Sequence, residues 1–246
     1  MSLAGHIALI TGAGQGIGRA CAAIFASKGA DLVLLDKNPE TLGEIAHEVA
    51  GMGRKVTSEV VDLIELRRLR EVAEKSRNMG LIDILVNNAG FDRPGTTAKI
   101  ERKEFEEVLG IHVTVPLTLI QIFLPGMRAA GWGRIINVSS IYGITGGKGE
   151  VAYSTAKAGV IGLTKSVAKE CGQDGVTVNA VLPGLTRTPT IETGMAERYK
   201  QDIIANTPLG RMAEPEEVAN VIAFLASDEA SFITGIALPV SGGWAV

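Results

Sequence analysis

Short apolar runs alternate with longer amphipathic segments along the whole chain. The apolar runs are bounded by turn residues, which is typical of strands buried on both faces. Strands are predicted at residues 7–10, 31–35, 55–61, 82–86, 134–138, 176–182 and 236–240. Helical periodicity marks residues 19–28, 39–52, 65–78, 102–110, 113–128, 153–171, 195–205 and 215–226. This alternation predicts one α/β domain over residues 1–246, a doubly wound parallel sheet of about seven strands with helices on both faces.

Composition supports a globular protein with an aliphatic core. Apolar residues make up 46% of the chain, aromatic residues only 4%, and charged residues 21%, which allows a large core with few aromatic side chains. The net charge of -3 and the lack of a basic block argue against a nucleic-acid partner. Residues 1–12 do not resemble a signal peptide. The apolar stretch 113–124 is broken by Thr, Pro and Gln, so no membrane span is expected.

The two cysteines carry no metal-site pattern. Cys21 and Cys171 lie inside helical patterns and far apart in the sequence. We therefore predict two buried, reduced thiols, no metal site and a cytoplasmic protein.

A glycine-rich turn follows the first predicted strand. Residues 11–18 read Thr-Gly-Ala-Gly-Gln-Gly-Ile-Gly and lead directly into a helix. Glycines let the backbone approach a pyrophosphate, whose charge is received by free N–H groups at the helix start. A glycine-rich loop alone would equally fit an ordinary tight turn. The strand before it and the helix after it favour the phosphate site.

The second predicted strand ends at Asp36, about twenty residues past the glycine-rich turn, where an acid bonds the adenosine ribose hydroxyls and repels a 2′-phosphate. This favours NAD(H) over NADP(H), although Lys37 could soften the repulsion. The segment also fits a helix start at Asn38 and Pro39, and both interpretations can hold.

Small and polar residues also end the other predicted strands. They are Asp62 and Leu63, Asn87-Asn88-Ala89-Gly90, Ser140, and Pro183-Gly184. The carboxyl ends of parallel strands share one sheet edge, where ligands bind in such sheets. Residues 87–90 also fit a plain Asn-Gly turn. Together with the glycine-rich turn and Asp36, these residues predict one ligand site along this edge.

Tyr153 and Lys157 stand four residues apart in a predicted helix. Positions i and i+4 share a helix face, so the phenol and the ammonium should point into the same space. A phenol has an ordinary pKa of about 10, and a neighbouring cation lowers that value. The pair could pass a proton to or from an alcohol or a carbonyl. The same spacing alone would also fit a surface pair.

On these motifs, the chain resembles the short-chain dehydrogenase/reductase family over essentially its whole length. Residues 11–18 look like the family's cofactor motif TGxxxGxG, residues 87–90 match NNAG, and residues 153–157 match YxxxK. Ser140 stands at the distance of the family's catalytic serine, and residues 183–188 fit its PG-x-x-x-T segment. The resemblance implies a Rossmann domain that binds NAD(P) and transfers hydride between nicotinamide and a carbon bearing an alcohol or ketone.

The resemblance also implies a role for each residue. Tyr153 would be the general base in oxidation and the general acid in reduction, and Lys157 would lower its pKa and hold the nicotinamide ribose. Ser140 would bind the substrate oxygen, whereas Ser139 would be structural. The expected cofactor-binding residues are Gly12, Gln15, Gly16, Ile17, Gly18, Asp36, Asp62, Leu63, Asn88, Ala89, Gly90, Tyr153, Lys157, Pro183, Gly184, Thr186 and Thr188.

His112 departs from the family pattern. Family members usually have an asparagine in the helix after the NNAG turn, and it holds a water that connects the lysine to solvent. This chain has His112 at the matching position. A neutral imidazole could keep the water chain, and a protonated one would place a second cation near Lys157. We count His112 among the catalytic candidates as part of a proton relay; the alternative is a histidine held only by helix packing.

The resemblance is close to 3-oxoacyl-acyl-carrier-protein reductases, and two features count against that assignment. Asp36 favours NAD(H), whereas those reductases typically use NADPH. They also tend to carry arginines that dock the acidic carrier, where this chain has Gly131 and Asp174. We therefore expect an NAD-dependent dehydrogenase of a small secondary alcohol, polyol or sugar-like substrate, with the reductase as the alternative. A non-catalytic cofactor sensor or scaffold is less favoured, because Ser140, Tyr153 and Lys157 are all present.

Three stretches should contact the substrate: residues 92–97, 141–151 and a lid at residues 185–212. They mix Arg93, Tyr142, Lys148, Glu150, Arg187 and Glu192 with apolar residues and show no paired clamp. The resemblance further implies a homotetramer, formed through the helices around residues 104–128 and 153–171 and through the C-terminal strand.

Overall fold

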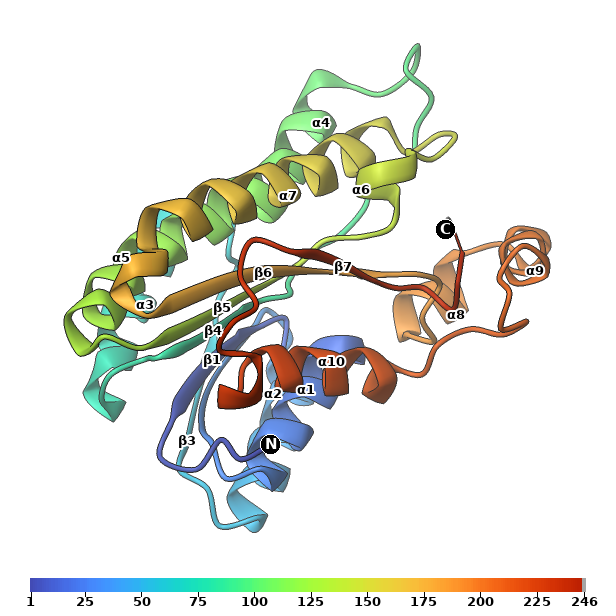
Figure 1. Ribbon diagram of the computed structural model, residues 1–246. Helices are drawn as coiled ribbons and strands as arrows, with labels where there is room; N and C mark the ends of the chain where they lie inside the picture. Colours follow the sequence, from blue (N-terminus) through green and yellow to red (C-terminus); the bar gives the residue numbers. More distant parts are fainter. Residues whose placement is uncertain (245–246) are drawn as a thin grey trace.

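The computed structural model describes residues 1–244 and contains a seven-stranded parallel sheet in the order β3-β2-β1-β4-β5-β6-β7 (Figure 1). The strands are β1 (Ile7–Thr11), β2 (Asp31–Asp36), β3 (Val56–Val60), β4 (Ile84–Asn87), β5 (Gly133–Val138), β6 (Val176–Pro183) and β7 (Ala237–Val240). Every predicted strand is present within a few residues of its expected position. The predicted doubly wound α/β fold is therefore confirmed.

Helices cover both faces of the sheet. In chain order, the α-helices of the described residues are α1 (Gly16–Ser27), α2 (Pro39–Gly51), α3 (Leu66–Ser76), α4 (Arg102–Leu109), α5 (Val115–Ala130), α6 (Tyr142–Thr145), α7 (Val151–Cys171), α8 (Pro189–Gly194), α9 (Glu197–Ala205) and α10 (Pro215–Leu225). Helices α1, α2 and α10 pack on one face, and α3, α5 and α7 pack on the other (Figure 1).

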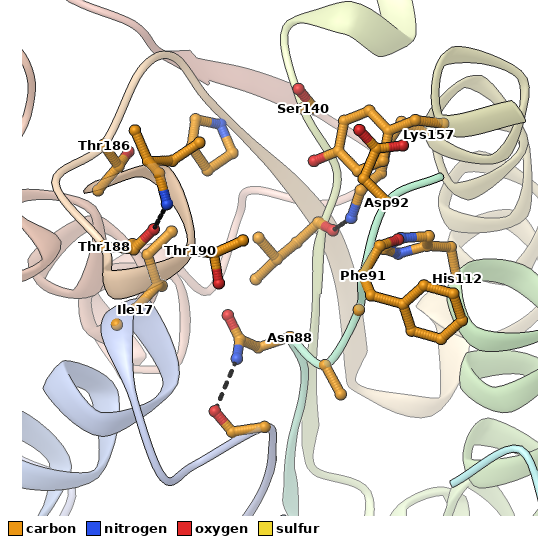
Figure 2. A pocket seen from close by; sticks show the side chains of 18 of the residues that line it. Ile17, Asn88, Phe91, Asp92, His112, Ser140, Lys157, Thr186, Thr188 and Thr190 are labelled. Carbon is orange, nitrogen blue, oxygen red and sulfur yellow. Dashed lines mark hydrogen bonds between the residues drawn. The ribbon is translucent and has the colours of Figure 1, made fainter. Parts of the chain in front are cut away.

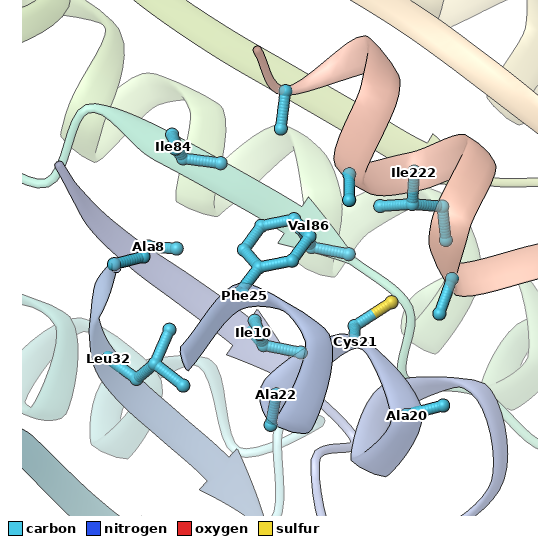
Figure 3. Close-up of a cluster of buried hydrophobic side chains, with 14 of the residues drawn as sticks. Ala8, Ile10, Ala20, Cys21, Ala22, Phe25, Leu32, Ile84, Val86 and Ile222 are labelled. Carbon is cyan, nitrogen blue, oxygen red and sulfur yellow. The ribbon is translucent and has the colours of Figure 1, made fainter. Parts of the chain in front are cut away.

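The core is aliphatic, as the scarcity of aromatic residues predicts. Figure 3 shows the cluster on the α1 face, where Phe25 and Cys21 of α1 pack with the strand residues Ile10 and Val86 and with Ile222 of α10. These side chains are all fully buried. Burying a side chain such as Phe or Ile contributes about 1.5–3 kcal/mol, so this cluster fixes α1 on the sheet. The start of α1 thereby has a fixed position at the end of β1.

The strand order reverses at β1, whose neighbours are β2 and β4. Ile10 of β1 pairs with Leu34 on one side and with Val86 on the other. From β1 the chain builds outward to β3, returns, and then builds β4 to β7 in the opposite direction. The connections diverge at such a switch point and leave a crevice beyond the carboxyl ends of the strands. The candidate site lies in this crevice.

The helical segment before β5 differs from the prediction. A π-helical turn, Gly110–Thr114, joins α4 to α5, so that helix runs without a break from Arg102 to Ala130. By length and composition this segment could cross a membrane, which corrects the expectation that no segment approaches such a span. Its most apolar window has a mean hydropathy of 1.8 and is 61% buried inside the protein. That burial fits a core helix, whose apolar residues face other parts of the same chain.

Two short helices, α6 and α8, were not predicted. Helix α6 directly follows Ser140. Helix α8 begins with Pro189 at its first turn, and the Thr188 hydroxyl accepts a hydrogen bond from the Ile191 N–H (3.4 Å). Both features are ordinary helix-start signals. The expected lid segment therefore contains two helices, α8 and α9, where one was predicted.

Candidate active site

A cavity of about 390 Å³ lies at the carboxyl ends of β1, β2, β4, β5 and β6. The predicted residues that line it are Gly12, Gln15, Gly16, Ile17, Asp36, Asp62, Leu63, Asn88, Ala89, Gly90, His112, Ser140, Tyr153, Lys157, Pro183, Gly184, Thr186 and Thr188. Gly18 is the exception. A Cβ atom there would lie 2.0 Å from the Gly12 carbonyl oxygen, so Gly18 permits close packing behind the loop.

The cavity is also lined by residues for which no cofactor or catalytic role was predicted. They are Lys37, Val61, Phe91, Asp92, Ile111, Val138, Ser139, Ile141, Tyr142, Glu150, Leu185, Thr190, Ile191, Met195, Ile203 and Trp244. Asp92, Ile141, Tyr142, Glu150 and the lining residues from Leu185 to Ile203 fall in stretches that were expected to contact substrate, whereas Trp244 does not. Apolar residues such as Val61 and Val138 carry no chemical signal, and only their position at strand ends could have identified them.

Charged residues of the expected lid lie outside this lining. Arg187 forms ion pairs with Glu192 (2.9 Å) and Glu214 (3.0 Å). All three are about half exposed, so these pairs face water and contribute little to stability.

The glycine-rich loop packs too closely against neighbouring segments for side chains at Gly12 and Gly14. A Cβ atom at Gly12 would lie 2.9 Å from the Ala89 Cα, and one at Gly14 would lie 2.5 Å from the Thr41 hydroxyl. Gly12 and Gly16 also have positive φ angles of 66° and 53°, which glycine adopts without strain. The α1 helix starts at Gly16 without a side-chain cap. This cradle fits a pyrophosphate received by backbone N–H groups.

Asn88 fastens the glycine-rich loop to the end of β4. Its side-chain amide donates to the carbonyl oxygens of Thr11 (2.9 Å) and Gly12 (3.2 Å), and the second of these bonds is drawn in Figure 2. The Thr11 hydroxyl in turn accepts from the N–H groups of Asn88 and Ala89, both at 3.0 Å. The NNAG turn therefore holds the neighbouring loop in place, which a plain Asn-Gly turn would not do.

Asp36 presents its carboxylate at the end of β2. One oxygen accepts from the Gly14 N–H (2.8 Å) and the other from the Asn38 N–H (3.0 Å). Asn38, and not Asp36, caps helix α2, because its side chain accepts from the N–H groups of Glu40 and Thr41. Asp36 is thus oriented beside the glycine-rich loop, with Lys37 next to it on the cavity wall.

Ser140, Tyr153 and Lys157 meet in the same cavity. Ser140 follows β5, and the other two residues lie one turn apart on α7. The Ser140 hydroxyl accepts from the Tyr142 N–H (3.2 Å) and lies near enough to the Tyr153 phenol to favour its ionised form. The Lys157 ammonium nitrogen lies 5.4 Å from the centre of the Tyr153 ring and donates to the Val138 carbonyl oxygen (2.7 Å; Figure 2). Ser139 donates to the Lys157 carbonyl oxygen (2.7 Å), which is the structural role predicted for it.

Burial dominates the pKa values of Tyr153 and Lys157. Desolvation raises the pKa of the Tyr153 phenol well above its ordinary value, and the nearby Ser140 hydroxyl opposes this only in part. Desolvation also lowers the pKa of Lys157 to about 7. A lysine cation was expected to lower the Tyr153 pKa. In the protein chain alone, burial raises that pKa instead, and Lys157 does not lower it.

Replacing Lys157 with methionine should stabilise the protein at low pH. Lys157 is 3% exposed, and below its lowered pKa the folded chain must bury a charge that water would solvate in the unfolded chain. We expect Lys157→Met to raise the free energy of unfolding by about 2–4 kcal/mol at about pH 6. The gain should shrink from about pH 7 to about pH 10, because the cost of holding Lys157 neutral falls as pH nears the ordinary lysine value.

Urea unfolding at several pH values measures this difference. Lys165→Met is the matched control, since Lys165 lies exposed on the same helix and its removal should give no such pH-dependent gain. A Lys157→Met protein no more stable than the wild type at low pH would contradict a buried, destabilised ammonium.

His112 lies in the π-helical turn between α4 and α5, 3% exposed. Its Nε2 lies 2.9 Å from the Phe91 carbonyl oxygen, and its ring meets the Tyr153 ring edge-on at 5.4 Å. A carbonyl only accepts, so we assign the proton to Nε2, which leaves Nδ1 as an acceptor. Burial first, and the Lys157 charge second, hold the pKa of His112 well below its ordinary value. The imidazole is therefore neutral. His112 does not place a second cation beside Lys157.

Gly90 makes room for this histidine. A Cβ atom at Gly90 would lie 1.9 Å from the imidazole Cε1. Figure 2 shows His112 beside Phe91, on the same side of the cavity as Lys157 and Ser140. The ring is thus both packed in the helix and exposed to the catalytic cavity.

Three comparisons identify similar proteins. A family model described as enoyl-(acyl carrier protein) reductase matches residues 12–245. The 3-oxoacyl-[acyl-carrier-protein] reductase FabG of Thermotoga maritima is 39% identical over 99% of both chains. A putative NAD(P)-dependent gluconate 5-dehydrogenase from Beutenbergia cavernae, solved with bound NADP at low occupancy, has a TM-score of 0.93 and 37% identity over 99% of this chain and 98% of its own. A blue fluorescent protein from a metagenomic library, solved with NADPH, has a TM-score of 0.94 and 29% identity over the whole of both chains.

Proposed function

Because the chain belongs to the short-chain dehydrogenase/reductase family and is an NAD(P)-dependent oxidoreductase of alcohols or ketones, we propose that it is a dehydrogenase that prefers NAD(H) and acts on a small secondary alcohol, polyol or sugar-like substrate. The observation that carries the proposal is the convergence of Ser140, Tyr153 and Lys157 beside the glycine cradle in one cavity. A non-catalytic sensor or scaffold would not need this convergence.

The cofactor would lie along the strand ends. The glycine-rich loop and the start of α1 would receive the pyrophosphate, Asp36 the adenosine ribose, and Asp62 with Leu63 the adenine. Pro183, Gly184, Thr186 and Thr188 would border the nicotinamide half. When bound, nicotinamide accepts or donates the hydride.

The protein's own groups would handle the substrate oxygen and its proton. Ser140 would donate a hydrogen bond to that oxygen and hold it near the phenol of Tyr153. Tyr153 would take the proton in oxidation and return it in reduction. Lys157 would bind the nicotinamide ribose. Its ammonium, once turned from Val138 toward the ribose, would favour the phenolate form of Tyr153.

The preference for NAD(H) rests on Asp36. Its carboxylate is held by two backbone N–H groups at the edge of the cavity, where it would repel a 2′-phosphate. The titles of the two solved neighbours name NADP and NADPH, so the comparisons do not support this preference. It is a proposal from the local charge.

The alternative is a 3-oxoacyl-acyl-carrier-protein reductase, which the full-length similarity to FabG favours. Two positions where such enzymes tend to have arginine hold Gly131 and Asp174 here. Asp174 forms an ion pair with Arg128 (2.9 Å). The Arg128 charge is therefore neutralised there and is not free to bind an acidic carrier. Steady-state rates with NADH and NADPH on a 3-oxoacyl thioester and on a small hydroxyketone separate the two functions. Higher kcat/KM for the thioester with NADPH would establish the alternative.

Residues 185–212 would form a lid over the substrate, because they carry α8 and α9 and contribute Met195 and Ile203 to the cavity wall. The single NAD(P)-binding domain over residues 1–246, the cytoplasmic location and the homotetramer also remain predictions. Light scattering coupled to size-exclusion chromatography tests the last of these.

His112 would act as a positioning residue in the proton relay. Its contact with the Tyr153 ring and its acceptor Nδ1 support this role, because Nδ1 could bind a water that leads to Lys157. We expect His112→Asn to move the apparent pKa of the pH–kcat profile by at least about half a unit, because the shorter side chain loses the Phe91 bond and rearranges this path. His47→Asn is the control, since His47 is exposed on α2. An unchanged pH–rate profile in His112→Asn would overturn the relay.

A further inference from the structure

Two carboxyl groups meet at the substrate side of the cavity. Asp92 follows the NNAG turn and Glu150 precedes α7. Their loops are joined by a hydrogen bond from the Gly95 N–H to the Gly149 carbonyl oxygen (2.7 Å). This bridge brings the two carboxyl groups close enough for Asp92 to raise the pKa of Glu150. Both line the cavity.

The acid pair, Asp92 and Glu150, has no cationic partner. Within residues 1–244, neither carboxylate forms an ion pair with lysine or arginine; Arg93, the nearest in sequence, directs its guanidinium to Glu107 (3.7 Å) and the Phe91 ring (4.7 Å). One Glu150 oxygen, Oε2, is buried without a hydrogen-bond partner. Such an acceptor is costly to leave unsatisfied, so a turn of the Glu150 carboxyl toward a ligand hydroxyl in the cavity would be favoured.

Burial and the Asp92 carboxyl raise the pKa of Glu150 to about 8. Near neutral pH the Glu150 carboxyl therefore largely keeps its proton. It can donate one hydrogen bond and accept others, as a hydroxyl group can.

The pair lies close to the reacting atoms. Both carboxylates raise the pKa of the Tyr153 phenol and of the neighbouring Tyr142 phenol. In Figure 2, Asp92 lies on the same side of the cavity as Ser140 and Lys157, across from Thr186 and Thr188. A substituent on a carbon next to the reacting carbon would therefore face the acid pair.

We propose that Asp92 and Glu150 select a substrate with a second hydroxyl beside the reacting alcohol, a vicinal diol or polyol, and exclude one with a carboxylate at that position. This inference rests on the proposed function and names its substrate class. The second hydroxyl satisfies the buried Glu150 oxygen, whereas a carboxylate is repelled by the charge of the pair.

Four matched alcohols test this inference: cyclohexanol, a vicinal cyclohexanediol, the corresponding hydroxy acid and the corresponding amino alcohol. Each is oxidised by the full-length enzyme near neutral pH with NAD and with NADP, followed by absorbance of the reduced cofactor. We expect kcat/KM for the diol to exceed that for the hydroxy acid by about 10- to 100-fold. Asp92→Asn combined with Glu150→Gln should reduce this ratio to within a few-fold of one. Glu216→Gln, an exposed acid on α10, should keep the wild-type ratio.

The outcomes are distinct. A hydroxy acid used as well as the diol, or a diol-to-acid ratio unchanged in the double variant, would overturn the role of the acid pair. An amino alcohol preferred at least about tenfold over the diol would overturn the hydroxyl assignment and identify a cationic substrate. No turnover of any of the four with either cofactor would overturn the proposed function, and this inference with it.

Discussion

Tyr153→Phe should lower kcat at least about 100-fold and leave the Kd of the reduced cofactor within about twofold of wild type. The substitution removes only the phenol oxygen, which lies near the Ser140 hydroxyl in the cavity. The ring, its contact with His112 and the cradle for the cofactor are kept. Without that oxygen the substrate proton has no acceptor at the reacting centre. The effect therefore falls on turnover and not on cofactor affinity.

A second phenol in the cavity provides the matched control. Tyr142 also lines the cavity and is also affected by Asp92 and Glu150. Tyr142→Phe should cost much less than Tyr153→Phe in kcat. Single-turnover absorbance with each variant, together with fluorescence titration of the reduced cofactor, makes the comparison. Comparable losses in the two variants, or an intact kcat in Tyr153→Phe, would remove Tyr153 from the mechanism.

Asp36→Asn should raise the ratio of kcat/KM for NADPH over NADH by about 10- to 100-fold. Asparagine keeps the shape and one acceptor oxygen, so that the bonds from the Gly14 and Asn38 N–H groups are only partly lost. The negative charge facing a 2′-phosphate is removed. Most of the change should therefore appear as a gain with NADPH.

Lys37→Met should move the same ratio in the opposite direction. Lys37 stands beside Asp36 on the cavity wall, and its loss removes the cation that offsets the repulsion. Steady-state kinetics with both cofactors on one substrate measure both variants. A wild-type enzyme that already favours NADPH, with no response to Asp36→Asn, would show that this carboxylate does not set the preference.

The fold could be predicted from the sequence because its inner strands, such as β1, β4, β5 and β6, are buried on both faces. Runs such as residues 7–10 and 32–35 are apolar throughout, and this pattern is difficult to reconcile with an exposed strand. Short helices were harder to predict. Helix α8 has a normal start at Thr188 and Pro189, yet its few residues give no periodicity to detect.

The catalytic cavity was predicted where residues lie at strand ends or share a helix face. Tyr153 and Lys157 are close through helical spacing, and the resemblance then supplied Ser140. Contacts between distant loops had no local signal. The acid pair depends on the bond between Gly95 and Gly149, and Asp92 and Glu150 are far apart in the chain.

The pKa values were the least predictable property. Helical spacing placed the Lys157 ammonium near Tyr153, and on that basis the phenol should become more acidic. Burial reverses the result, since it raises the pKa of Tyr153 and lowers that of Lys157. The depth of the cavity, which decides this balance, comes from the packing of β5, α7 and the π-helical turn, and no short motif encodes it.

Hydride transfer from the substrate to nicotinamide is the central step of the proposed function. Transfer of deuterium from a labelled substrate to NAD tests it most directly. The enzyme is incubated with NAD and a vicinal cyclohexanediol deuterated at its carbinol carbons, and the cofactor is analysed by mass spectrometry. We predict NADH that carries a single deuterium, formed by the wild type and essentially lost in Tyr153→Phe. Reduced cofactor without deuterium, or labelled NADH formed equally well by both proteins, would contradict the account.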